Sequence, residues 1–166
     1  MTSTVLNMRP DVEHPETGID DKQLVAANVA ACLADSYLLM VKTQAYHWNA
    51  VGPLFHSIHA LTEEQYEEMF KAIDDLAERI RALGYPAPSS IADMIGLAEI
   101  HEDIGNPTTE EMVSNLVADH EIAARRFRES AERADQTRDL VTADLLTERI
   151  AFHEKAAWML RSILTN

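Results

Sequence analysis

The chain is 166 residues long, enough for one domain with a sizeable buried core, and its hydrophobic fraction of 46% argues against disorder throughout. The formal net charge of -14 disfavours nucleic acid and anionic membranes as partners and favours cations. The single cysteine, Cys32, excludes an intrachain disulfide framework. No segment resembles a signal peptide or a transmembrane helix, so we expect a soluble cytoplasmic protein.

The N-terminal segment 1–20 is mostly polar and contains two prolines and a glycine, so we expect a flexible, irregular tail. The folded domain should then span residues 21–166. Its first helix is predicted over 21–49, where apolar residues occupy more than one face. This distribution suits a helix that contacts both its own bundle and a neighbouring chain. Gly52 and Pro53 end the pattern.

The second helix is predicted over 55–83. Gly84 stands where a C-terminal cap belongs, and Pro86 prevents continuation. A short helix is expected over 90–98, inside the long connection that follows. The core stripe of the second helix repeats at steps of four and three residues and consists of Met69, Ile73, Leu76, Ile80 and Leu83.

A capping box at Thr108 and Glu111 begins the third long helix, and the fourth is expected from about Thr142. Their core stripes are Met112, Leu116, Ala123, Phe127 and Ala134, and then Leu146, Ile150, His153, Ala157, Leu160 and Leu164. Four long helices with one long middle connection predict an all-α, ferritin-like four-helix bundle, because an up-down bundle needs no such connection. Another all-α fold is the alternative.

Four potential metal ligands share one face of the second helix. His59 and Glu63 are four residues apart, and Asp74 and Glu78 repeat this spacing. At 3.6 residues per turn the four positions lie within a sector of about 100°, beside the core stripe. The two pairs cannot bind one ion within one chain, because Glu63 and Asp74 are ~16 Å apart along the axis. Two copies of the helix running antiparallel across a two-fold axis would bring one pair to the other.

The ligand set combines imidazoles and carboxylates without a thiolate, which suits iron, zinc or manganese. His47, near the end of the first helix, is a further candidate for the same region. The alternative is a solvated acidic helix face. A di-iron site within one chain is disfavoured, because such sites use Glu-x-x-His and no histidine here has Glu three residues before it.

Several sequence blocks resemble the Dps family, the bacterial mini-ferritins. They are QAYHWN at 44–49, GPLF at 52–55, SIHALTE at 57–63, DDLAERI at 74–80 and LG at 83–84. The steps of twelve residues from His47 to His59 and of fifteen from His59 to Asp74 match the ligand spacing of that family. The helix plan and the ending over 144–160 are similar as well, so the resemblance covers nearly the whole chain.

The resemblance implies a hollow homododecameric cage of 23 symmetry, with a ferroxidase centre that binds two iron ions between two subunits. His47, His59 and Glu63 would come from one chain, and Asp74 and Glu78 from its two-fold partner. Glu63 stands where many members have Asp; it keeps the charge and adds one methylene. The indole of Trp48 would lie beside the centre, in a packing or an electronic role.

The chemistry that the resemblance implies is oxidation of Fe(II) by hydrogen peroxide, in preference to dioxygen, followed by storage of Fe(III) as a mineral. Acidic pores on three-fold axes would admit iron near the start of the last helix, where Asp135, Asp139 and Asp144 are the candidates. Leu140 stands where some members have Asp. The alternative for these residues is a solvated loop and helix N-terminus, where Asp is favoured anyway.

Many members bind DNA through a lysine-rich tail, but residues 1–21 contain one basic and five acidic residues, a net charge of -4. Binding to phosphates needs clustered cations, so we expect no appreciable direct DNA binding. A nucleoid-associated DNA-protection protein is therefore the second hypothesis, and an all-α oligomeric binding module with an inert acidic face is the third. Outside the proposed centre, we expect His120 and His153 to be hydrogen-bonded core histidines and Trp158 to be a packing residue.

Overall fold

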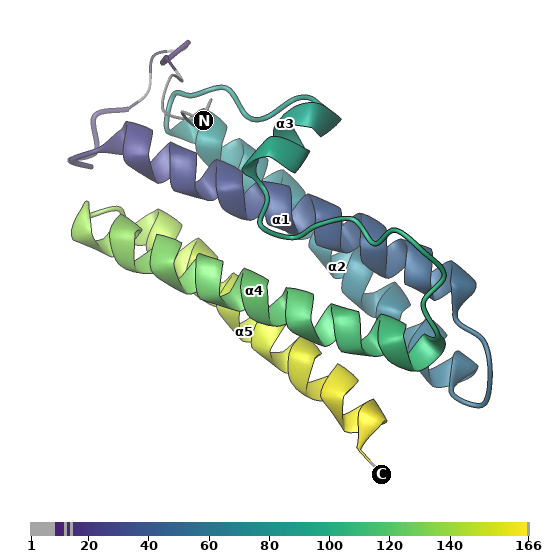
Figure 1. Cartoon of the computed structure of the whole chain (residues 1–166). Helices are drawn as coiled ribbons and strands as arrows, with labels where there is room; N and C mark the ends of the chain where they lie inside the picture. Colours follow the sequence, from purple (N-terminus) through teal and green to yellow (C-terminus); the bar gives the residue numbers. More distant parts are fainter. Residues whose placement is uncertain (1–8, 12, 14, 166) are drawn as a thin grey trace.

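The computed structural model describes residues 9–11, 13 and 15–165. This part of the chain forms five helices and no strand, in the order α1 (Lys22–Asn49), α2 (Phe55–Ala82), α3 (Ile91–Leu97), α4 (Thr109–Gln136) and α5 (Leu140–Leu164). Helices α1 and α2 form one antiparallel pair and α4 and α5 another, and the two pairs pack into a four-helix bundle (Figure 1). The predicted all-α bundle with a short extra helix is confirmed.

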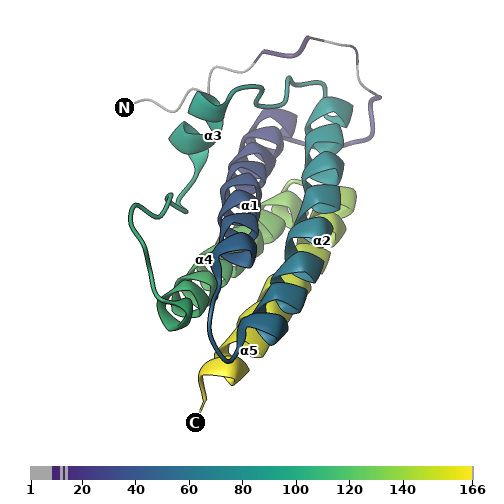
Figure 2. The same cartoon turned by 90° about the vertical axis from the view of Figure 1, so that its right-hand side faces the viewer.

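The connection over residues 83–108 carries α3 and passes along the outside of α1 to the start of α4 (Figures 1 and 2). One buried carboxylate holds it in place. Asp35 of α1 accepts hydrogen bonds from the backbone N–H groups of Glu99 at 2.7 Å and Ile100 at 3.0 Å, and pairs with Arg126 of α4 at 2.7 Å. The crossover is therefore fixed to two helices of the bundle.

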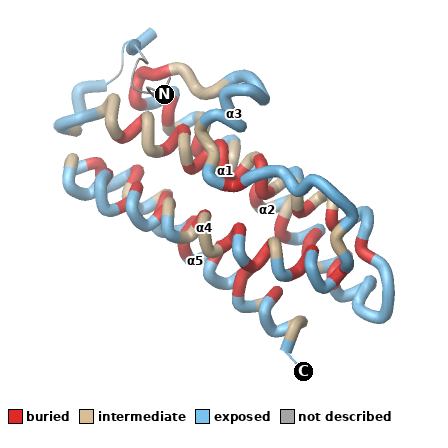
Figure 3. Tube along the Cα trace, in the orientation of Figure 1, coloured by how far each residue is buried: buried red, intermediate tan, exposed pale blue. Residues whose placement is uncertain are grey.

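The core lies between the two helix pairs, where the buried positions of each helix face inward (Figure 3). Of the stripe predicted for the second helix, only Ile73 is half-buried and the other four residues are buried. Among the described residues α1 alone is long and apolar enough to cross a bilayer by length and composition. Because 61% of that stretch is buried inside the bundle, we interpret α1 as a core helix.

The helix ends follow local sequence signals. At the end of α2, Gly84 has a φ of 95°, and its N–H donates to the carbonyl of Arg81 while that of Tyr85 donates to Ile80, which is a Schellman motif. The capping box predicted at the start of α4 is present. Helix α5 begins at Leu140, two residues before the expected start, because Asp139 caps it.

The described part of segment 1–20 contains no helix or strand and contacts the end of the bundle where α2 ends and α5 begins. The N–H of Asp11 donates to the carbonyl of Gly84 at 3.0 Å, and that of Asp20 donates to Thr137 at 3.1 Å. Arg81 also pairs with Asp11 at 2.8 Å. The other residues of the predicted tail lie outside the described part of the chain.

Candidate metal centre

The short turn between α1 and α2 brings His47 and His59 into contact. Their rings stack with centroids 3.7 Å apart and an interplanar angle of 16°. Nδ1 of His47 lies 2.9 Å from the carbonyl oxygen of His59, and Nδ1 of His59 lies 3.0 Å from the carbonyl oxygen of His47. Because a carbonyl oxygen only accepts, each Nδ1 carries the proton and donates it. Each Nε2 is then the nitrogen available to bind a metal ion.

Neighbouring side chains on α2 fix the two imidazoles. Phe55 packs against His59 with centroids 5.0 Å apart, and Tyr66 meets His47 edge-on at 5.3 Å. The hydroxyl oxygen of Thr62, a fully buried residue, lies 3.5 Å from Nδ1 of His47. Sequence reasoning missed these three supports. The sequence signal that could have found them is their spacing from His59. Residues four positions before, three after and seven after His59 lie on the same helix face.

The predicted carboxylate ligands Glu63, Asp74 and Glu78 are exposed on the same helix. Within the described part of the chain none of them takes part in a hydrogen bond or ion pair, whereas Glu68 of the same helix pairs with Arg149 at 2.5 Å. Three carboxylates on one face therefore remain open to a cation.

No complete ligand set forms within one chain. Among the described residues, no three His, Cys, Asp or Glu side chains lie close enough together to hold a metal ion. The fold thus brings His47 and His59 together and leaves Asp74 and Glu78 further along α2. A shared site between two chains stays a prediction.

Large apolar side chains are exposed at the turn that joins the helices of the histidine pair. Trp48 is 65% exposed and Val51 is 71% exposed, and Leu54 and Phe55 are exposed as well. All four lie at or beside the turn between α1 and α2. A cluster of large exposed apolar residues is typical of an interaction surface.

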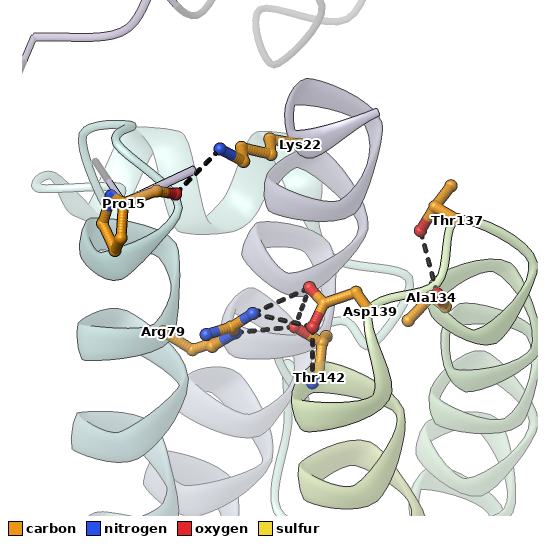
Figure 4. A network of polar contacts seen from close by, with 7 residues as sticks. All are labelled: Pro15, Lys22, Arg79, Ala134, Thr137, Asp139 and Thr142. Atoms are coloured by element: carbon orange, nitrogen blue, oxygen red, sulfur yellow. Dashed lines mark hydrogen bonds and ion pairs between the residues drawn. The ribbon is translucent and has the colours of Figure 1, made fainter. Parts of the chain in front are cut away.

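The three aspartates predicted for a pore differ in their surroundings. Asp135 and Asp144 are exposed, but Asp139 is 1% exposed and its carboxylate is fully engaged. It accepts from Arg79 at 2.7 and 2.9 Å and from the backbone N–H and hydroxyl of Thr142 at 3.0 and 2.6 Å (Figure 4). Burial alone raises the pKa of this carboxyl, but the hydrogen bonds from Arg79 and Thr142 outweigh it and hold the pKa below its ordinary value.

Asp139 therefore caps α5 and neutralises Arg79. Its oxygens are not available to an ion in transit, and only Asp135 and Asp144 remain as pore candidates.

Comparison with known proteins identifies the family. Residues 27–166 match the family model described as Ferritin-like domain. The chain is 48% identical over 134 residues to an uncharacterized low temperature-induced protein of Nostoc, covering 80% of this chain and 75% of that protein. It is 36% identical over 143 residues to a DNA protection during starvation protein of Brevibacillus brevis, covering 86% of this chain and 96% of that protein.

Comparison with solved structures points to the same family. The Dps protein of Vibrio cholerae, described as a member of a broad superfamily of ferritin-like diiron-carboxylate proteins, is 30% identical with a TM-score of 0.86. The match covers 95% of this chain and all of that chain. The chain therefore belongs to the ferritin-like proteins and, among them, to the Dps mini-ferritins.

Proposed function

We propose that this protein oxidises Fe(II) and stores the Fe(III), with the paired imidazoles of His47 and His59 as the fixed half of the centre. The observation that carries the proposal is their reciprocal hydrogen bonding. It directs both Nδ1 protons to backbone carbonyls, so both Nε2 atoms can act as ligands without losing a proton.

The other half of the centre comes from a second chain. His47, His59 and Glu63 of one subunit face Asp74 and Glu78 of the partner subunit across a two-fold axis, and the symmetry makes two equal sites. Each site takes two iron ions. The exposed apolar residues beside the pair, Trp48 and Val51 among them, support burial of this surface against a partner. Six such pairs assemble into the dodecameric cage.

The reaction takes one electron from each of two Fe(II) ions and delivers both to one hydrogen peroxide. Its O–O bond breaks, and with two protons it yields two waters, so no hydroxyl radical escapes. Carboxylates favour the more highly charged Fe(III) and thereby assist electron loss. The Fe(III) then hydrolyses and accumulates as a mineral inside the cage. Dioxygen is the slower oxidant in this proposal.

Iron enters through pores lined by Asp135 and Asp144. Both side chains are exposed, and Asp144 lies on the second turn of α5. The formal charge of -14 supports the accumulation of cations at the shell. We propose that the cage works in the cytoplasm.

The test is stopped-flow measurement of Fe(II) loss in the presence of peroxide. The wild-type protein should speed it, and His47→Ala with His59→Ala should lose this activity. His56→Ala is the matched control, because His56 is exposed, lies three residues before His59 and has no part in the centre. A wild-type protein that does not accelerate Fe(II) loss contradicts the proposal.

Direct DNA binding is the second function to consider, because the Brevibacillus relative is named for DNA protection. Here the described N-terminal residues carry Asp11, Glu13, Glu16 and Asp20, and Arg9 is their single cation. We propose that any protection of DNA acts through removal of iron and peroxide. A salt-sensitive gel shift at physiological ionic strength would overturn this part of the proposal.

A further inference from the structure

An exposed phenyl ring lies in the middle of the α2 face that holds the proposed metal ligands. Phe70 is 68% exposed although it lies well inside the helix. At 3.6 residues per turn its position lies about 20° from that of His59, inside the sector of about 100° that the four predicted ligands of α2 occupy. A large apolar side chain exposed among carboxylates indicates that this face contacts another surface.

A groove of about 500 Å³ lies beside this ring, between α1 and α2. It is lined by two residues of α1 and four of α2, which are Met40, Gln44, Tyr66, Glu67, Phe70 and Lys71. Tyr66 and Met40 are half-buried, so an aromatic ring and a thioether form part of the wall. Both pack well against an aromatic side chain that enters from outside.

The charges beside the groove have no partner within the chain. Lys71 and Glu67 are both exposed, and neither forms an ion pair among the described residues. The two arginines of α2 differ, because they are engaged by Asp139 and Asp11. A two-fold contact between copies of this face would bring each cation near a carboxylate of the other copy, and it would do so twice.

The register of the proposed iron centre, on which this inference rests, brings these groups together. When Glu63 faces the partner's Asp74 on antiparallel helices, the two-fold axis passes at the level between positions 68 and 69. Position 70 is then level with position 67 of the partner. The two Phe70 side chains are ~4.5 Å apart along the helix direction, and each lies ~1.5 Å from the level of the partner's Tyr66. Lys71 lies equally close to the level of the partner's Glu67.

We propose that this face of α2 is the contact between two copies of the chain, in which Phe70 of each copy enters the groove of the other and Lys71 pairs with the partner's Glu67. The rings supply apolar burial at the axis. The two ion pairs offset the repulsion between the ligand carboxylates of the two copies. Residues that bind no metal thereby set the register that brings Asp74 and Glu78 to the histidines of the partner.

The test is the assembly of the full-length protein without metal ions, followed by native mass spectrometry and by sedimentation over a range of concentrations. We expect the wild type to form assemblies with an even number of chains. Phe70→Asp should raise the concentration at which they dissociate by at least ~10-fold, because a charge replaces an aromatic residue at the centre of the contact. Ile104→Asp, at a position that is 96% exposed on the crossover, is the matched control and should assemble like the wild type.

A charge exchange tests the pairing separately and decides the matter if Phe70→Asp fails to fold. Lys71→Glu and Glu67→Lys each place like charges opposite one another, so each variant alone should assemble less well than the wild type. A mixture of the two should form pairs with one chain of each kind, because both facing positions then carry opposite charges. An effect on the helix of a single chain, where the two positions are one turn apart, would not be relieved by mixing.

Wild-type assembly of Phe70→Asp would overturn the contact, as would a mixture of the charge variants without preference for mixed pairs. Both measurements are made without iron, so they are independent of the oxidation assay. Assembly as expected in a protein that does not oxidise Fe(II) would contradict the proposed function and support the contact. Fe(II) oxidation by a protein whose assembly ignores Phe70 and Lys71 would overturn the contact alone.

Discussion

At the scale of single residues, the geometry of His47 depends on the rings around it. The stacked His59 covers one face, and Tyr66 approaches at 5.3 Å with its plane at 78°. An imidazole held in this way keeps the direction of its Nε2 lone pair. Removal of such a supporting contact typically lowers metal affinity or activity by about 10–100-fold.

The first prediction separates the packing of Tyr66 from its hydroxyl. Tyr66→Ala removes the edge contact and should slow Fe(II) oxidation by about 10-fold, whereas Tyr66→Phe keeps the contact and should stay close to wild type. Stopped-flow oxidation rates at equal protein concentration compare the two. Equal loss in both variants would show that the phenol itself takes part.

The second prediction concerns acid stability. Burial lowers the pKa of His120 to about 3, and burial together with the charges of His120 and Arg149 lowers the pKa of His153. In the unfolded chain both histidines titrate near about 6.5, so below this pH the unfolded state binds more protons. The free energy of unfolding should therefore fall as the pH drops below about 6.5, by up to ~1.4 kcal/mol per pH unit for each histidine.

Urea unfolding at several pH values between about 7 and 5 measures this slope. Replacing His120 and His153 by Leu should remove their contribution to the slope, because Leu does not titrate. A variant whose stability falls with pH as steeply as that of the wild type would contradict the assignment, since other groups would then be responsible.

At the scale of the elements, the turn between α4 and α5 depends on the buried contact of Asp139 with Arg79. Asp139→Ala removes the cap of α5 and leaves the guanidinium of Arg79 unpaired, with a side chain only 16% exposed. Loss of one partner of such a pair costs about 3–5 kcal/mol. Asp135→Ala, at an exposed position in the last turn of α4, should change the free energy of unfolding by less than about 0.5 kcal/mol. Urea denaturation of the two variants side by side is the measurement, and equal stabilities would refute the structural role of Asp139.

The sequence predicts most elements within one or two residues, because helical periodicity and end signals are local. The capping box at Thr108 and the Schellman glycine Gly84 depend only on neighbours within the same turn. The start of α5 is harder to predict from the sequence, because its first residues, Leu140 and Val141, are exposed and belong to no core stripe.

The candidate site is predictable only in part, for a related reason. Spacing places His59 and Glu63 on one helix face, and the family resemblance adds His47. Whether a carboxylate or an imidazole is already engaged by another side chain depends on contacts between residues that are far apart in the chain. Arg79 engages Asp139 sixty positions away, and His120 meets His153 across two helices. Local sequence patterns do not predict such pairs.

At the scale of the whole molecule, the pore proposal predicts an effect on iron entry. Asp144→Asn removes one negative charge per subunit from the proposed ring and should slow Fe(II) oxidation several-fold at low ionic strength, with a smaller effect in high salt. Glu110→Gln, which changes an exposed acid at the start of α4, is the control. Equal slowing in both proteins would attribute the effect to total charge rather than to a pore.

The central claim is that the iron centre is shared between two chains, and a mixing experiment tests it most directly. One variant carries His47→Ala and His59→Ala, and the other carries Asp74→Ala and Glu78→Ala, so each alone lacks half of every site. In a randomly mixed assembly roughly a quarter of the sites combine the intact histidines of one chain with the intact carboxylates of its partner. We expect two inactive proteins, refolded together, to regain roughly a quarter of the wild-type rate of Fe(II) oxidation under peroxide. A mixture as inactive as its components would contradict the shared centre.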